Sequence, residues 1–432
     1  MTPQSSFLVA APIAPQREAE LRRVLGSMNV SPGELDPRNA LLPFAQFENV
    51  HFARLFIIDD ATLADAEVFG IAPPSYPLYL AFMGDVDGDA GAFLRTVAER
   101  CGEGLRALFG CCAGFDGAGD VGAWLQAHRV RPAVTYGNWA GRTMRQVREE
   151  AALHGALERY VALQAEALAA LTPRQVHQTL RAFVDAEVEG GRLTLTAAAP
   201  TPLGWRLRDL AHLIGFPLLL LLASPLLLIA GIVLLVRLRR LETTDPDVDT
   251  RLTLDYTVAL AALEDHGVTN QFSVVGMVKP GLVRRWTSTF VLWITDYAAR
   301  HVFTRGHLAR IQTIHFASWT WLDGKQRVLF CSNYDGGLDS YNDDFINKVS
   351  FGLNATFGGG IGYPRTNWLV LDGADDEQAF KNVLRRKQLP TQVWYDAQPG
   401  LTTFDRRRNA AIRAGLQAVA TDEDARAWAA LL

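Results

Sequence analysis

A stretch of 26 residues in the middle of the chain, 211–236, contains no Asp, Glu, Lys or Arg. In a helix that rises ~1.5 Å per residue it would reach ~39 Å, more than the ~30 Å hydrocarbon core of a bilayer. A long surface helix of a soluble protein shows a polar face, and this stretch shows none. The sequence therefore predicts a membrane element; the alternative is a helix buried in a large soluble core.

Arginines lie on both sides of this stretch: Arg206, Arg208, Arg237, Arg239 and Arg240. Lys and Arg normally gather on the cytoplasmic side of a membrane, so a helix that crosses once should be basic at one end only. Pro217 and Pro225 each remove a backbone donor and tend to bend or break a helix. Together these features favour a helical hairpin over 206–240 that dips into one leaflet and returns. A single kinked span is the alternative, because membrane helices tolerate proline.

The composition limits the class of protein. With 432 residues and 49% hydrophobic content, the chain has material for two or three domains with cores of their own. The net charge of -4 argues against nucleic acid as the main partner. The first 15 residues lack the basic start of a secretory signal, and the four cysteines show no zinc-binding spacing. We therefore expect reduced thiols, no metal site, and a chain that faces the cytoplasm.

The chain also contains a weak internal duplication. Three pairs of landmarks recur in the same order: His51 with His315, Asp87 with Asp335, and Tyr136 with Tyr395. Their offsets are 264 (315 − 51), 248 (335 − 87) and 259 (395 − 136) residues. Each histidine stands at the start of an apolar strand, each aspartate ends the next strand, and each tyrosine belongs to a later aromatic strand. Nearly constant offsets in one order predict two related halves.

Each half also begins with a strand and a helix, so both follow the order strand, helix, strand, strand, helix, strand. This is the order of the ferredoxin-like βαββαβ unit. Such a unit has helices on one face of its sheet only, and pairing two units buries the bare faces. The chain is thus similar to the dimeric α/β-barrel superfamily over about residues 1–145 and 270–405. The expected fold class is α+β, with tandem ferredoxin-like units that form a pseudo-dimer. Since a single membrane span would separate the units, their pairing also favours the hairpin.

The expected domains follow from these features. They are a first ferredoxin-like unit at 1–145, a helical connector at 146–205, the membrane segment at 206–240, a second unit at 250–405 and a C-terminal helix at 406–432. Thr143 and Gln146 fit a capping box at the start of the connector. The arginines at 406–408 could face anionic headgroups or form a solvated helix face. Both units are expected on the cytoplasmic side of the membrane.

Residues 84–88, Gly-Asp-Val-Asp-Gly, resemble the G-x-x-D-G string of the dye-decolorizing peroxidases, haem enzymes built from two ferredoxin-like units. This resemblance implies that Asp87 is catalytic. The repeat partner of the string, Asp335 followed by Gly336, favours a simpler interpretation. Asp accepts backbone N–H groups in turns and Gly adopts positive φ there, so a duplicated Asp-Gly fits a duplicated turn. The Asn-Pro that typically follows the string in the family is missing here.

The same resemblance bears on His301 and Arg305, which follow the first helix of the second half. It implies that His301 is the axial ligand of a haem and Arg305 a distal or propionate-binding group. An axial imidazole sets the reactivity of iron, and a guanidinium stabilises charge on a cleaving peroxide. The alternative is that both residues are cations at a helix C-terminus, where they favourably meet the helix dipole. The family's fuller Arg-Arg-Gly pattern is absent.

His51 and His315 are candidates for a shared cofactor-binding role or for structural histidines at equivalent places. Tyr136 and Tyr395 are interpreted as core aromatics at strand ends rather than redox groups. Two classes of function remain open. One is a haem-dependent, peroxidase-like oxidoreductase that acts on lipid-derived substrates at the bilayer. The other is a non-enzymatic lipid-binding or scaffolding protein, with membrane lipids as partners and a small apolar ligand between its units.

Overall fold

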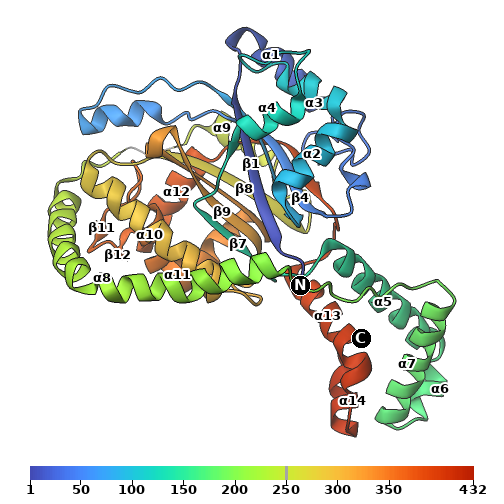
Figure 1. Ribbon diagram of the computed structural model, residues 1–432. Helices are drawn as coiled ribbons and strands as arrows, with labels where there is room; N and C mark the ends of the chain where they lie inside the picture. The colour runs from blue at the N-terminus through green and yellow to red at the C-terminus, as the bar shows by residue number, and fades with distance from the viewer. Residues whose placement is uncertain (249–251) are drawn as a thin grey trace.

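The computed structural model describes residues 1–248 and 252–432 and contains both helices and antiparallel sheets. Two main sheets pack against each other at the centre of the molecule, and helices cover their outer faces (Figure 1). The predicted start of the second unit, residue 250, lies outside the described residues. The first strand of that half begins at Thr269. Below, "first half" means residues 1–143 and "second half" means residues 252–402.

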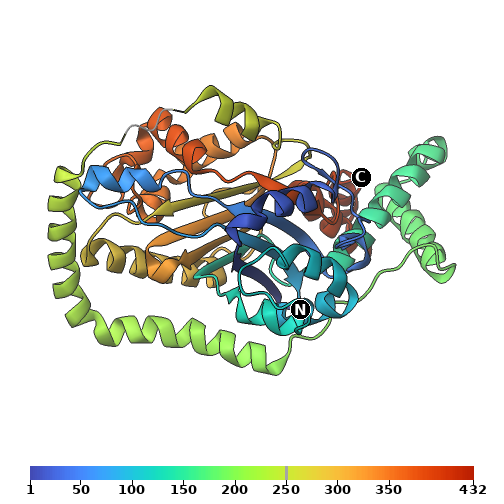
Figure 2. The ribbon, with the colours of Figure 1, turned by 90° about the horizontal axis from the view of Figure 1, so that it is seen from above.

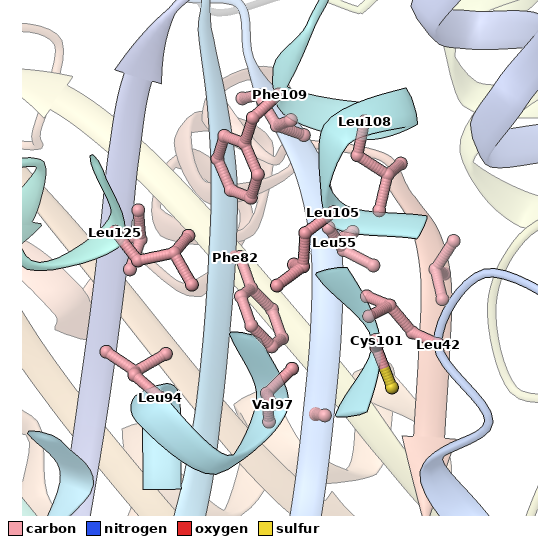
Figure 3. Packing of buried hydrophobic residues seen from close by; sticks show 14 of the residues in the cluster. Leu42, Leu55, Phe82, Leu94, Val97, Cys101, Leu105, Leu108, Phe109 and Leu125 are labelled. Carbon is pink, nitrogen blue, oxygen red and sulfur yellow. The ribbon is translucent and has the colours of Figure 1, made fainter. Parts of the chain in front are cut away.

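The first main sheet has the strand order β13-β4-β5-β1-β6. Its strands are β1 (Gln4–Pro12), β4 (Val50–Ile58), β5 (Tyr79–Asp87), β6 (Arg129–Val130) and β13 (Thr391–Asp396). Its outer helices are α1 (Glu18–Gly26), α2 (Ala90–Arg100), α3 (Gly102–Phe109) and α4 (Val121–Ala127). Between strands and helices lies an apolar core in which Phe82 of β5 packs among Leu94, Val97 and Leu105 (Figure 3). A small hairpin, β2 (Asn29–Ser31) and β3 (Glu34–Leu35), lies beside this sheet.

The second main sheet has the strand order β7-β9-β10-β8. Its strands are β7 (Val134–Gly137), β8 (Thr269–Met277), β9 (Ile314–Leu322) and β10 (Arg327–Asp335). The helices of this half are α9 (Leu254–Ala261), α10 (Leu282–His301), α11 (Leu338–Phe357) and α12 (Glu377–Lys387). A second small hairpin consists of β11 (Thr366–Asn367) and β12 (Leu371–Asp372). In both halves the middle strands are buried along almost their whole length, since helices cover one face and the other sheet covers the second.

Each half lends its last strand to the sheet of the other half. β6 pairs with β1 in the first sheet, and the chain then continues into β7, which pairs with β9 in the second sheet. In the same way Gln388 bridges to Val274 of β8, and the chain continues into β13, which pairs with β4 in the first sheet. The registers correspond, because Tyr136 lies opposite Ala317 and Tyr395 lies opposite Ala53. These partners are 264 residues apart (317 − 53), the same offset as the two histidines.

A buried polar cluster joins the two sheets beside the apolar contacts between them. Arg54 of β4 is 2% exposed and donates hydrogen bonds to the second half only. Its acceptors are the carbonyl oxygens of Phe272 (3.0 Å) and Ser332 (2.9 Å), Oγ of Ser273 (2.9 Å) and Oδ1 of Asn333. Nδ2 of Asn333 in turn donates to Oδ2 of Asp85 on β5 at 2.9 Å. One side chain thus connects strands of both halves.

A separate group of helices stands away from the sheets (Figure 1). It consists of α5 (Met144–Leu163), α6 (Ala165–Ala169), α7 (Pro173–Glu189), α13 (Thr403–Ala418) and α14 (Asp422–Ala429). The capping box predicted at Thr143 and Gln146 is present. The C-terminal segment differs from the single helix predicted over 406–432. It forms two helices because Thr421 caps a new helix with its own capping box.

The apolar stretch lies in one long helix, α8 (Leu203–Thr244), and does not form the predicted hairpin. The helix continues through Pro217 and Pro225, bends once and runs around the outside of the second half (Figure 2). Proline removes one hydrogen bond and kinks a helix, which does not by itself reverse the chain. Among the described residues, α8 is the one helix long and apolar enough to cross a membrane, and none of its apolar window is buried.

Candidate functional site

Two His–Asp pairs lie at equivalent places in the two halves. Nε2 of His51 is 2.9 Å from Oδ1 of Asp87, and Nε2 of His315 is 2.6 Å from Oδ1 of Asp335. His51, Asp87 and His315 are buried, and the side chain of Asp335 is 9% exposed. An ionised carboxylate can only accept hydrogen bonds, so the imidazole nitrogen that bonds to it is the donor.

The second oxygen of each carboxylate holds the start of a helix. Oδ2 of Asp87 accepts from the backbone N–H of Met144 at 2.7 Å, and Oδ2 of Asp335 accepts from the backbone N–H of Thr403 at 2.8 Å. Met144 and Thr403 are the first residues of α5 and α13. A helix N-terminus favours a negative charge, so each pair fastens the helix that follows an exchanged strand.

The turn predicted for the two Asp-Gly sequences explains their glycines but not their aspartates. Gly88 and Gly336 have φ of 88° and 83°, values that favour glycine over other residues. The side chains of Asp87 and Asp335 reach the histidine and the distant helix instead of capping their own turns. These contacts could not be predicted from the sequence, because the two helices begin 57 and 68 residues after the aspartates that bind them.

The electrostatics of the second pair follow from its burial. Burial lowers the pKa of the His315 imidazole, and the nearby Arg406 cation lowers it further. Burial by itself would raise the pKa of the Asp335 carboxyl. The His315 ring and the N–H and hydroxyl donors of Thr403 outweigh it and hold that pKa below its ordinary value. The stable form is therefore a neutral imidazole that donates to an ionised carboxylate.

Aromatic rings fill the space between the two pairs. Phe316 lies 5.3 Å from the His51 ring and 5.9 Å from Phe52, and Phe52 lies 5.3 Å from the His315 ring. Arg406 lies over Phe52 at 5.3 Å. The cavity that remains has a volume of about 30 Å³, enough for about two water molecules. This arrangement is typical of a packed core, and we assign the His51 and His315 pairs to the fold.

The third histidine of interest, His301, ends α10 and faces α8. Its Nε2 is 2.8 Å from Nδ1 of His212, and burial lowers the pKa of His301. Arg305 follows shortly after and forms a backbone bridge with Trp139. His301 and Arg305 line one broad groove, whereas Asp87 is held by His51 outside it. The structure thus brings two of the three proposed catalytic residues together and places Asp87 elsewhere.

None of the three candidate histidines presents a free Nε2 to a haem iron. An axial ligand must offer a nitrogen lone pair to iron, and Nε2 of His301 already contacts His212. Nε2 of His51 and of His315 is held by a carboxylate, beside a cavity far smaller than a porphyrin. Within residues 1–248 and 252–432, no group of three or more His, Cys, Asp or Glu side chains could hold a metal ion. All four cysteines are free and buried.

The surface around α8 is the most unusual on the molecule. We call it the apolar belt: the exposed Leu, Ile and Val side chains between 213 and 236 on α8, with Trp286, Phe290, Trp293 and Ile294 on α10. The arginines predicted to flank the membrane segment lie at its two ends, and Arg206, Arg208, Arg237 and Arg240 are exposed while Arg239 is half-buried.

The part of the belt on α10 was missed by the sequence interpretation. Trp286, Phe290 and Trp293 recur at intervals of four and three residues, which places them on one face of a helix. That pattern could have indicated an apolar face, but it is equally typical of a core helix. Contacts decide between the two, because Phe216 of α8 packs against Trp293 (4.6 Å) and Tyr297 (4.7 Å) and leaves the rest of the face exposed.

Comparisons of the chain with protein-family models, with curated proteins and with solved structures find no match.

Proposed function

We propose that this chain consists of two tandem ferredoxin-like units and acts as a membrane-attached, non-enzymatic lipid-binding protein. The apolar belt is the observation that carries this proposal. Fully burying a Leu, Ile or Phe side chain contributes about 1.5–3 kcal/mol, and the belt holds many such side chains in the open. A contiguous apolar surface of this extent marks an interaction with lipid or protein. Trp286 and Trp293 favour lipid, since tryptophan is enriched at the membrane interface.

The two ends of α8 favour insertion into one leaflet over a complete span. Near its start, Phe216 packs on α10, and near its end Glu242 accepts hydrogen bonds from Thr366 (2.7 Å) and from the backbone of Trp368 (3.0 Å). Both anchors belong to the second half. A helix that crossed the bilayer would separate its ends by ~30 Å of hydrocarbon, and the second half would have to follow it through the membrane. We therefore propose that both units lie on one side of the membrane, and the arginines at both ends of α8 favour the cytoplasmic side.

A vesicle flotation experiment tests attachment through the belt. Leu222 and Leu226 are 72% and 71% exposed on α8, and Leu222→Glu with Leu226→Glu places two charges in the belt. The control is Leu163→Glu with Leu254→Glu, at leucines that are 82% and 77% exposed on α5 and α9. Wild type and control should float with phosphatidylcholine vesicles, whereas the belt variant should remain at the bottom. Equal flotation of all three proteins would refute the proposal.

Sidedness and chemistry need separate measurements. Reporter fusions after residues 200 and 245, which flank α8, should report the same compartment, and opposite compartments would contradict one-leaflet insertion. An absorption scan after haem supplementation should be featureless for the wild type. A Soret band that disappears in His301→Ala would favour the peroxidase-like oxidoreductase instead.

A further inference from the structure

A broad groove runs beside the first arm of α8, the part of the helix that precedes its bend. On one side are the edges of β1, β6 and β7, and on the other are α8 and the end of α10. Its volume is about 1110 Å³, and four arginines line it: Arg129, Arg131, Arg300 and Arg305. We call it the basic groove.

Most of the positive charge in the basic groove is uncompensated. Arg300 is paired with Asp209, whose Oδ1 lies 2.9 Å from its Nε. Arg129, Arg131 and Arg305 have no ion pair within the described residues. The other acidic residue of the groove is Asp296; burial raises the pKa of its carboxyl, and the nearby His212, Arg300 and Arg131 partly offset this rise. Three guanidinium groups of the groove thus have no carboxylate of a described residue within ion-pair distance, and an anion could take that place.

The duplicated fold provides an internal comparison. The equivalent groove of the second half is lined by Tyr395, the partner of Tyr136, and by residues 267–271 of β8 and the preceding turn. Its volume is about 350 Å³, and no Lys or Arg lines it within residues 1–248 and 252–432. At the offset of 259 residues, the positions of Arg129 and Arg131 are taken by Gln388 and Pro390. The same strand exchange thus forms without these cations, so the fold does not require them.

The position of the groove indicates the other part of the ligand. Trp205 and Leu213 of α8 form part of its wall, and α8 continues from there directly into the apolar belt. Trp139 lies on the opposite wall. Tryptophan offers an apolar ring with one polar N–H and is favoured where a polar headgroup meets hydrocarbon. An amphiphile with an anionic head in the groove and its chain along α8 would match both surfaces.

We propose that the basic groove binds the phosphate headgroup of an anionic membrane lipid. This proposal rests on the membrane attachment proposed above and adds the lipid class to it. Arginine suits the role because its planar guanidinium donates two parallel hydrogen bonds to a phosphate. One arginine beside an anionic lipid surface is expected to strengthen binding about fivefold, so removal of two should weaken binding about 30-fold.

The test compares two double variants on two kinds of vesicle. Arg131→Gln with Arg305→Gln removes two groove cations. Arg23→Gln with Arg95→Gln removes two exposed cations from α1 and α2, on the outer side of the first sheet, that form no ion pair with any residue the structure describes. Partitioning is measured on vesicles of phosphatidylcholine alone and on vesicles that also contain phosphatidylglycerol.

Wild type and the Arg23/Arg95 variant should bind phosphatidylglycerol vesicles more tightly than neutral ones, and the Arg131/Arg305 variant should lose that gain about 30-fold. Its binding to neutral vesicles should remain at the wild-type level. An equal loss in both variants would show non-specific attraction and overturn the site. Failure of the wild type to bind neutral vesicles would instead overturn attachment through the belt.

A free anion is the other source of the same chemistry. Inorganic phosphate is therefore titrated without lipid while the thermal unfolding of the wild type and the Arg131/Arg305 variant is followed. Little stabilisation of either protein is expected, because a lone phosphate makes no contact with the apolar belt. Stabilisation of the wild type alone, together with no gain on phosphatidylglycerol vesicles, would assign the groove to a soluble anion and overturn the lipid proposal.

Discussion

Replacement of Arg54 by methionine should weaken the pairing of the two sheets. The substitution keeps most of the volume and removes a cation that is 2% exposed. Four acceptors of the second half would lose their donor, and Asp85 would lose its nearest positive charge. Breaking a buried charge network by removing one partner costs about 3–5 kcal/mol. Burial already raises the pKa of Asp85, so the orphaned carboxyl would take up a proton and limit the cost.

The free energy of unfolding is measured by urea denaturation in detergent, with tryptophan fluorescence as the signal. Arg95→Met, at an exposed arginine on α2, is the control and should change stability by less than about 0.5 kcal/mol. Asp85→Asn combined with Arg54→Met should recover part of the loss, because the partners interact and their effects do not add. If Arg54→Met were as stable as the control, the polar cluster would not hold the sheets together.

Three further perturbations test other parts of the structure. Burial lowers the pKa of His315, so as the pH falls the unfolded chain binds a proton at this histidine before the folded chain does. The free energy of unfolding of the wild type should therefore decrease below about pH 6.5, and that of His315→Gln should decrease less. Urea denaturation at a series of pH values measures both. Gly104→Ala should destabilise the protein by about 1–3 kcal/mol, because its new Cβ would stand 2.0 Å from the carbonyl oxygen of Leu41. Gly102→Ala is the control, since its Cβ meets no atom within 4 Å and should leave the thermal unfolding nearly unchanged. Phe216→Ala should release the first arm of α8 from α10, which hydrogen exchange would detect as faster exchange in that arm while the sheets keep their protection.

The sequence predicted the structure best where a pattern of residues is compatible with few environments. The absence of charge over 211–236 led to the long exposed helix, because few environments accept such a helix. The three landmark pairs were also found at equivalent places, with the histidines second in β4 and β9 and the aspartates last in β5 and β10. Their spacing is nearly constant because the residues of each pair make the same contacts in the two halves.

The exchange of last strands could not be predicted in the same way. β7 is four residues long, and its alternation of buried and exposed side chains suits the edge of either sheet. The partner is chosen by distant contacts, such as the hydrogen bond from the backbone of Asn138 to the carbonyl oxygen of His315 at 2.8 Å. The course of α8 could not be predicted either. Proline indicates a kink, but the contacts of Phe216 and Glu242 determine where the parts of the helix before and after the bend lie.

The comparison of the two halves separates residues that maintain the fold from residues that carry function. Positions that keep the same contacts in both halves, such as the His–Asp pairs, are explained by the strand exchange and the helices it fastens. Positions that differ need another reason, and they gather in one region. Arg129 and Arg131 replace the neutral Gln388 and Pro390, the groove beside them is about three times larger, and α8 forms its wall. Since charge, space and exposed apolar surface all depart from the duplicated pattern at the same place, the lipid binding that we propose is assigned to that place and not to the duplicated histidines.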